Sequence, residues 1–198
     1  MLVRECMTKE PVTVSPQEDV RVAFSLLRQY GFCQFPVVKD GALVGIVTDR
    51  DLRNAINIDD HLVVADVMSS NPVTVYEDTS LEEAAWIIRS HKFNALPVLS
   101  KTGKLVGIIT VTDILDGLLK LLGFHGKPVR VEVKVPEGTD FFEVLKVIRI
   151  ASDKVLSFSF PSGKQDKCYL WVIGCDFDKL DKKLEERELD VEITFSEL

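Results

Sequence analysis

Apolar residues recur at i, i+3, i+4 and i+7 in two stretches of the chain, which is the spacing of one buried helix face. These residues are Val20, Ala23, Phe24 and Leu27 in the first stretch and Leu81, Ala84, Ala85 and Ile88 in the second. The first helix should begin near Ser15, which can act as a cap, with Pro16 in the first helical position and Glu18 completing a capping box. Asp78 or Thr79 should cap the second helix.

Each helical stretch is followed by two short apolar runs around a turn, which predicts a buried β-hairpin. The runs are residues 36–38 and 43–47 in the first case, and residues 96–99 and 105–109 in the second. Thr48 and Thr110 follow the hairpins and should open two closing helices. With a strand before the first helix, each module is expected to have the order βαββα.

The two modules are copies of each other in sequence. Residues 7–51 align with residues 68–113, and 17 of the 45 aligned positions are identical when a one-residue slip is placed in the hairpin turn. A repeat of this kind determines the architecture, because two similar modules can pack about a pseudo-twofold axis. The cleft between them should then contain two related pockets.

The pattern changes after a second boundary at residues 118–127, which carry helix-stop signals. Strand-like and helical stretches then alternate in the order βαββαβ, a split βαβ pattern. The expected elements are residues 129–135, 139–151, 155–160, 169–173, 176–187 and 191–195, with a polar turn at 162–167. We therefore expect three domains, residues 1–60, 61–122 and 127–198, with residues 54–62 linking the first two.

Composition narrows the possible functions. With 198 residues, 46% of them hydrophobic, the chain can bury a sizeable core. Its net charge of −7 argues against binding nucleic acid or an anionic membrane through overall charge. We expect no signal peptide, no membrane span and a cytoplasmic location. The four cysteines and three histidines show no metal-ligand or disulfide spacing, so no metal site is predicted.

The candidate chemistry lies in a Thr-x-x-Asp motif that ends both modules, Thr48 to Asp51 and Thr110 to Asp113. A helix N-terminus offers unpaired N–H groups, and the Thr hydroxyl adds a donor, so a phosphate could be bound there. The Asp carboxylate can accept hydrogen bonds from a ribose diol, and Arg50 adds a positive charge. The alternative is an ordinary helix cap with no ligand.

The repeated frame of Pro-Val-Thr-Val, amphipathic helix, Pro-Val, Leu-Val-Gly-Ile and Thr-x-x-Asp closely resembles the cystathionine-β-synthase (CBS) domain. The tandem, about residues 3–118, is similar to a CBS pair, or Bateman module. This resemblance implies a regulatory module that binds AMP, ADP, ATP or S-adenosylmethionine. It implies that Asp51 and Asp113 hold ribose hydroxyls, with Thr48, Arg50, Thr110 and Thr112 at or near the phosphate positions. The residues that would flank the base are Thr13, Val14, Cys33, Gln34, Phe35, Thr74, Val75, Asn94, Ala95 and Leu96.

The chain departs from this family pattern in ways that affect the ligand. Gln34 and Ala95 stand where many nucleotide-charge sensors of the family have a basic residue, and Thr112 stands in the second copy where the first has Arg50. The two sites should therefore differ in affinity. His91 and Lys92 could supply charge across the cleft, although a solvated helix end is the alternative role for them.

The C-terminal region is similar in element order and length to an ACT domain, a ferredoxin-like module that often binds amino acids. Its loop at residues 136–140 lacks the Asp-x-Pro-Gly character of amino-acid binders, so a dimerisation sheet is an equal alternative. A CBS pair followed by an ACT domain resembles the AcuB-type acetoin-utilisation regulators. The implied fold is thus mixed α/β and α+β, with two βαββα repeats and a βαββαβ domain.

Together these features predict a homodimeric regulatory protein that senses an adenine nucleotide and acts on an unidentified protein target. The dimer is expected because the two apolar helix faces belong to a module pair that looks too thin to bury them alone. A structural or interaction module without a ligand and an S-adenosylmethionine sensor are the alternatives. No nucleophile or phosphate-loop motif of an enzyme is present, so no catalysis and no catalytic cofactor are expected.

Overall fold

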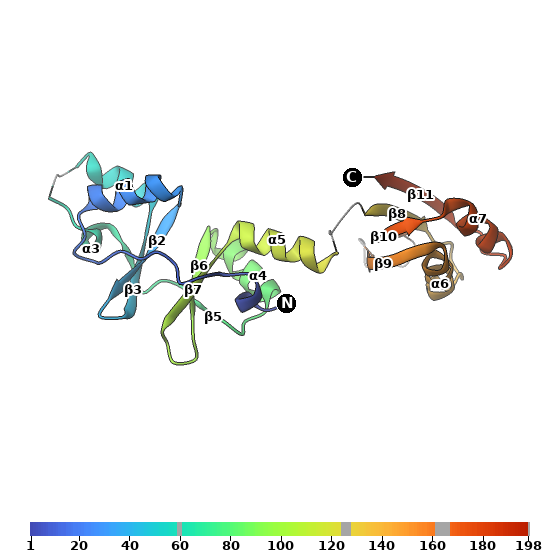
Figure 1. Cartoon of the computed structure of the whole chain (residues 1–198), viewed down its shortest axis with the longest axis horizontal. Coiled ribbons are helices and arrows are strands. Elements are labelled where there is room, and N and C mark those ends of the chain that lie inside the picture. The colour runs from blue at the N-terminus through green and yellow to red at the C-terminus, as the bar shows by residue number, and fades with distance from the viewer. Residues whose placement is uncertain (59–60, 124–127, 161–166, 198) are drawn as a thin grey trace. The chain divides into compact units, whose positions relative to one another are not determined.

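The computed structural model describes residues 1–58, 61–123, 128–160 and 167–197 and divides into two compact units, Met1–Leu118 and Leu119–Leu198 (Figure 1). The elements up to the second repeat are η1 Val3–Glu5, β1 Thr8–Lys9, α1 Val20–Tyr30, β2 Gln34–Lys39, β3 Ala42–Thr48, α2 Asp49–Ile56, α3 Val64–Val67 and β4 Ser69–Ser70. The second repeat contains β5 Val75–Tyr76, α4 Leu81–His91, β6 Ala95–Leu99, β7 Leu105–Thr110 and α5 Val111–Leu121. The expected mixed α/β architecture with two similar modules is confirmed.

The two β-hairpins have equivalent registers. Phe35 pairs with Val47 in β2–β3, and Leu96 pairs with Ile109 in β6–β7, at the same place in each repeat. All four side chains are at most 1% exposed, so each hairpin presents one face to its own core. Each turn contains a glycine with positive φ (81° and 78°), a conformation that other residues adopt only at a cost.

The short strands that precede the repeats are exchanged between them. β1, near the N-terminus, pairs with β7 of the second repeat, whereas β4, after the first repeat, pairs with β3. Val3 also donates its backbone N–H to Thr79 O at 2.9 Å and is fully buried in the second core. The first nine residues thus pack with the second repeat, although they precede the first repeat in sequence.

The apolar helix faces pack inside the unit. Ala23 and Leu27 of α1 are at most 2% exposed, and so are Leu81 and Ala84 of α4. Each face contacts the hairpin of its own repeat in one of two separate cores. The expectation that these faces drive dimerisation is therefore wrong, because the module pair buries them within a single chain.

Two helices begin later than the sequence suggested. The cap of α1 is Asp19, whose carboxylate accepts hydrogen bonds from the two N–H groups that follow the first helical residue. Residues 15–18 instead form a turn closed by Glu18 N–H to Ser15 O at 3.1 Å, and Glu18 C=O accepts the N–H of Val64 at 2.9 Å, so the helix starts later. In the second repeat Ser80, not Asp78 or Thr79, caps α4 by accepting the N–H of Glu83 at 3.1 Å.

The second unit has the expected βαββαβ order, with β8 Val129–Lys134, α6 Phe141–Ala151, β9 Ser152–Ser159, β10 Lys167–Cys175, α7 Phe177–Glu185 and β11 Glu192–Glu197. The strands form one antiparallel sheet in the order β11-β8-β10-β9, which is the split βαβ arrangement. Apolar residues of α6 and α7 pack with those of the central strands into a single core. The polar turn expected at 162–167 falls almost entirely outside the described residues.

The expected inter-repeat link begins as helix, because α2 continues to Ile56, and residues 59–60 lie outside the described ranges. The second expected boundary coincides with the end of α5. Over the described parts of the chain, no helix is long and apolar enough to cross a membrane. The division into domains 1–60, 61–122 and 127–198 remains a prediction.

Candidate functional site

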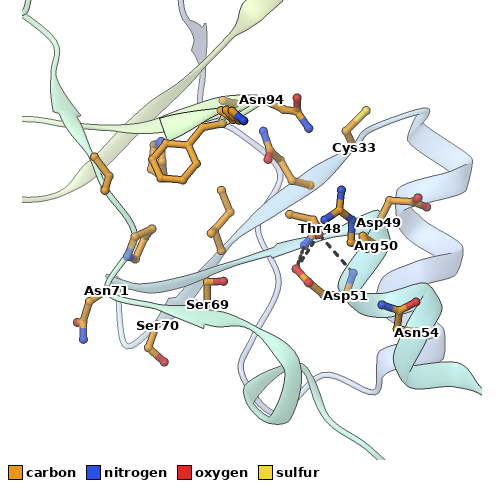
Figure 2. A pocket seen from close by; sticks show the side chains of 18 of the residues that line it. Cys33, Thr48, Asp49, Arg50, Asp51, Asn54, Ser69, Ser70, Asn71 and Asn94 are labelled. Atoms are coloured by element: carbon orange, nitrogen blue, oxygen red, sulfur yellow. Dashed lines mark hydrogen bonds between the residues drawn. The ribbon is translucent and has the colours of Figure 1, made fainter. Parts of the chain in front are cut away.

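The first Thr-x-x-Asp motif lies where β3 ends and α2 begins, and its two polar side chains bind each other. Asp51 Oδ2 accepts hydrogen bonds from the Thr48 backbone N–H at 3.0 Å and from the Thr48 hydroxyl at 2.6 Å. Asp51 N–H donates in return to Thr48 Oγ1 at 3.3 Å. This ring closes the start of the helix and occupies one oxygen of the carboxylate. Asp51 Oδ1 accepts no hydrogen bond from the described residues (Figure 2).

The second motif has the same geometry. Asp113 Oδ2 accepts the Thr110 N–H and hydroxyl at 2.8 Å each, and Asp113 N–H donates to Thr110 Oγ1 at 3.1 Å. The first backbone N–H of each helix is also engaged in an equivalent way, because Asp49 N–H donates to Cys33 O at 2.9 Å and Val111 N–H to Asn94 O at 3.0 Å. The pseudo-symmetry of the sequence therefore extends to individual hydrogen bonds.

These bonds engage two hydroxyls that were expected near a phosphate, and that expected role stays a prediction. The Thr48 and Thr110 hydroxyls each donate their hydrogen to the adjacent Asp, so neither offers a hydrogen to a phosphate in this structure. Both motifs do act as helix caps, which was the alternative interpretation. Capping leaves the second carboxylate oxygen available, so it does not by itself exclude a ligand.

A cavity of about 720 Å³ lies between the two repeats next to the first motif. The start of α2 contributes Arg50 and Asp51, and the beginning of the second repeat contributes residues 69–73. Residues 92–95 of the second repeat complete it, and Figure 2 shows Asn94 on this side of the pocket and Asp51 on the other. The volume falls within the range of roughly 300–1,000 Å³ that is typical of small-molecule sites. We call it cavity one.

A second cavity of about 360 Å³ lies next to the second motif and is built from equivalent positions. The 61- and 62-residue offsets of the repeat relate Thr8, Pro11 and Val12 here to residues 69, 72 and 73 of cavity one, and residues 110–112 to residues 48–50. Cys33, Gln34 and Asn94 line both cavities and form a shared wall. We call this space cavity two.

The structure brings together some of the residues expected to bind nucleotide and separates others. Those that line cavity one are Cys33, Gln34, Thr48, Arg50, Asp51, Asn94 and Ala95, and those that line cavity two are Cys33, Gln34, Asn94, Thr110 and Thr112. Asp113, Thr13 and Thr74 line neither cavity. The side chains of Val14, Phe35, Val75 and Leu96 are at most 4% exposed and belong to the two cores.

Sequence reasoning missed other lining residues. Pro72 and Val73 line cavity one, and Pro11 and Val12 line cavity two, each pair standing immediately before the Thr-Val expected to flank the base. Pairing explains the difference, because Val14 bridges Val37 and Val75 pairs with Val98, which buries both valines in the cores. The repeat alignment gave a usable signal, since both Pro-Val pairs are identical between the copies.

Some charged side chains that line cavity one form ion pairs and others do not. Arg53 forms an ion pair with Asp49 within α2, which largely neutralises both groups. Arg50 and Lys92 also line the cavity, and neither forms an ion pair with any described residue. Lys92 therefore contributes charge to the cavity, whereas His91 stacks on Phe93 and does not line it. With Asp51 as the remaining anion, the unpaired groups carry a net positive charge.

The described residues contain no group of three or more His, Cys, Asp or Glu side chains that could hold a metal ion. The four cysteines are free thiols. The polar groups of the cavities are hydroxyls, amides, carboxylates and cations, which suit hydrogen bonding to an organic ligand.

Comparison with known proteins identifies the repeats. The sequence model of the family described as "CBS domain" matches residues 3–58 and 64–120. A CBS domain-containing protein of Dictyostelium discoideum is 38% identical over 136 residues, which cover 62% of this chain and 94% of that protein. An inosine-5'-monophosphate dehydrogenase of Korarchaeum cryptofilum is 39% identical over 106 residues, but the match spans only 22% of the length of that enzyme and 54% of this chain.

Solved structures show the same relationship. The plant protein CBSX2 in complex with AMP has a TM-score of 0.55 and 33% identity, covering 61% of this chain and 97% of that one. A putative acetoin utilization protein (AcuB) from Vibrio cholerae has a TM-score of 0.57 and 30% identity over 64% of this chain and 98% of its own. The CBS pair of the protein MJ0100, in complex with 5'-methylthioadenosine and S-adenosylmethionine, has a TM-score of 0.55 and 26% identity, covering 60% of this chain and 95% of that one. Because the family model covers more than half of the sequence and both repeats, the chain belongs to the CBS-domain family.

Proposed function

We propose that this protein is a regulatory sensor that binds an adenosine nucleotide of the AMP, ADP and ATP class in cavity one. The observation that carries the proposal is the free Oδ1 of Asp51, held in place by Thr48 beside an unpaired Arg50 in the same cavity. A carboxylate oxygen of this kind accepts hydrogen bonds from a ribose diol. A fixed guanidinium at the start of a helix favours phosphate.

The remaining walls suit the other parts of such a ligand. Pro72, Val73 and Phe93 provide apolar surface for a purine ring, and Asn94 provides amide groups that can bind its edge. Lys92 adds a second cation for the phosphate. The ligand bound to CBSX2 is AMP, and the two ligands of MJ0100 both contain adenosine, which supports an adenosine derivative here.

S-adenosylmethionine remains the second candidate, since one related CBS pair binds it. Its sulfonium group is positively charged and would lie among cations if it occupied cavity one. Like charges brought close together in a partly buried site repel each other. The charges of cavity one therefore favour a phosphorylated ligand over a sulfonium ligand.

We further propose that the protein works in the cytoplasm as a homodimer that controls another protein. A ligand can change the output only if its affinities for two conformations differ, so the nucleotide would shift the population of two packings of the CBS pair. The C-terminal unit would stabilise the dimer or relay this shift in the manner of an ACT domain. The protein would not be a catalyst.

Thermal unfolding with and without ligand tests the proposal on the full chain. AMP at about a hundred times its dissociation constant should raise the free energy of unfolding by about 2.7 kcal/mol if it binds one site of the native state only. ADP and ATP should also stabilise the fold. If AMP, ADP, ATP and S-adenosylmethionine all leave the melting temperature unchanged at saturating concentration, the motifs are helix caps only and the structural-module alternative holds.

A further inference from the structure

The two cavities are built from equivalent positions of the repeat, but the residues at those positions differ in charge. Ile46 of cavity one corresponds to Ile108 of cavity two, and Pro97 corresponds to Pro36. The apolar frame of the two sites is therefore retained. The charged positions are not retained.

Each unpaired cation of cavity one is replaced in cavity two by a neutral residue. Arg50 corresponds to Thr112, and Lys92 corresponds to Gly31. The ion pair of α2 has no counterpart either, because Asp49 corresponds to Val111 and Arg53 to Leu115. As a result, none of the residues lining cavity two carries a formal charge.

A phosphate that entered cavity two would lose hydration without gaining a charged partner. Leaving an ionised group partly desolvated and unpaired is costly, and charge-assisted hydrogen bonds are about twice as strong as neutral ones. An uncharged ligand meets no such cost there. Its hydroxyl, amino and ring-nitrogen groups can bind Thr112, Gln34 and Asn94, while Phe32 and Val111 provide apolar surface for a ring.

We propose that cavity two is a second ligand site that selects an uncharged nucleoside, such as adenosine or 5'-methylthioadenosine, and rejects its phosphorylated forms. The idea that the two sites bind different ligands rests on the proposed function of cavity one. Binding of a nucleoside in cavity two does not depend on it. The protein would then bind two regulatory ligands, a nucleotide and a nucleoside. Their binding sites touch the same wall, made of Cys33, Gln34 and Asn94.

Isothermal titration of the full chain tests the selectivity. AMP alone should fill one site per chain, and its affinity for cavity two should be weaker by about tenfold or more because a charge-assisted contact is missing. Adenosine should then bind a further equivalent in protein already saturated with AMP. The variant Thr112→Arg should create a second AMP site, whereas the matched variant Arg50→Thr should weaken AMP at cavity one.

Two bulky substitutions at equivalent exposed positions assign each ligand to its cavity. Val12 and Val73 are 38% and 41% exposed, so a larger side chain at either position disturbs little core packing. Val12→Trp should abolish adenosine binding to AMP-saturated protein and leave AMP binding intact, and Val73→Trp should weaken AMP. The wild-type stoichiometry provides the same test without relying on any variant to fold.

The outcomes separate this inference from the proposed function. AMP filling both wild-type cavities with equal affinity, or adenosine failing to bind beside AMP, overturns the inference and leaves the nucleotide sensor intact. Adenosine binding that Val12→Trp removes, in a chain that binds no nucleotide at all, supports the inference and overturns the proposed function. If neither ligand binds, both are overturned.

Discussion

Thr48 and Asp51 hold each other through both the backbone and the side chain, with two hydrogen bonds of 3.0 and 2.6 Å ending on a single carboxylate oxygen. Oδ2 of Asp51 is thereby engaged in the helix cap, and Oδ1 is left for a ligand. This division fixes the orientation of the free oxygen before any ligand arrives, which lowers the entropy cost of binding. It also shows how one motif can cap a helix and serve a binding site.

The first prediction concerns that free oxygen. Asp51→Asn keeps one oxygen for the Thr48 cap but places an amide nitrogen where the free acceptor stood. Loss of a hydrogen bond to a charged group costs about 1.5–3 kcal/mol, so AMP affinity should fall roughly ten- to a hundredfold in calorimetry. Asp113→Asn is the matched control and should change AMP affinity little, because Asp113 does not line cavity one. Equal losses in the two variants would contradict this assignment.

The second prediction concerns Lys92, which has a left-handed backbone conformation at the end of α4 with a φ of 58°. Its counterpart after α1 is Gly31, with a φ of 69°. Lys92→Gly should therefore stabilise the ligand-free protein by up to about 1 kcal/mol, since glycine adopts this conformation without steric cost. The same change should weaken AMP binding, because it removes a cation from cavity one.

Thermal unfolding and calorimetry of Lys92→Gly measure the two effects separately. Lys92→Asn is the control for the charge, because asparagine also tolerates the left-handed region but, like glycine, carries no charge. A variant that is more stable yet binds AMP as tightly as the wild type would show that Lys92 does not contact the phosphate.

A third prediction concerns the exchanged strands. A methyl group on Gly45 would lie 2.5 Å from Met68 Sδ and 3.1 Å from the Ser69 carbonyl oxygen, which belongs to β4. Gly45→Ala should therefore destabilise the fold by about 1–3 kcal/mol, the usual cost of overpacking. Gly107→Ala should behave alike, because its methyl group would meet Met7 Sδ at 2.5 Å. Chemical denaturation measures both changes, and a neutral result for either would mean that the exchanged strand is not closely packed.

A fourth prediction concerns thiol reactivity. Burial raises the pKa of the Cys168 thiol to about 11, and burial also raises the pKa of Cys175. Both thiols therefore stay protonated at neutral pH and should react slowly with a thiolate-directed reagent, and their rates should rise only as the solution becomes strongly alkaline. Cys33 is exposed and lines both cavities, so it should be labelled first.

Bound AMP should slow the labelling of Cys33 and leave the other thiols unaffected. Mass spectrometry of the labelled peptides over time distinguishes the four sites. In denaturant the four thiols should react at similar rates. Protection of all four by AMP would indicate a general tightening of the fold instead of occupancy of the cavity.

The fifth prediction concerns the homodimer. Trp86 on α4 and Leu115 on α5 are 64% and 54% exposed, although large apolar residues are usually covered. If the exposed side of α4 forms the dimer, Trp86→Glu should convert the dimer to a monomer of about 22.2 kDa in light scattering. Arg89→Glu, which changes charge on the same helix without removing apolar surface, is the control. A wild-type protein that is already monomeric at micromolar concentration would contradict the homodimer proposal.

The sequence by itself determined the repeat, its βαββα order and both Thr-x-x-Asp motifs, because these depend on local periodicity and on short-range hydrogen bonds. The two hairpins were also predictable from their apolar runs, which contain the paired residues Leu96 and Ile109. Their register came from the structure, where Phe35, one residue before its run, pairs with Val47. The βαββαβ order of the C-terminal unit followed from the same kind of pattern. Local signals misplaced two helix starts, where pairing with a distant segment overrode the capping preference of Ser15.

Only the tertiary structure decided which residues line the two cavities. Val14 bridges Val37 and Val75 pairs with Val98, so both are buried in the cores, whereas the Pro-Val pairs just before them line the cavities. The contribution of Lys92 to cavity one depends on the packing of one repeat against the other, which no local pattern contains. The exchange of β1 and β4 between the repeats is likewise a long-range pairing of two-residue strands, too short to leave a periodic signal in the sequence.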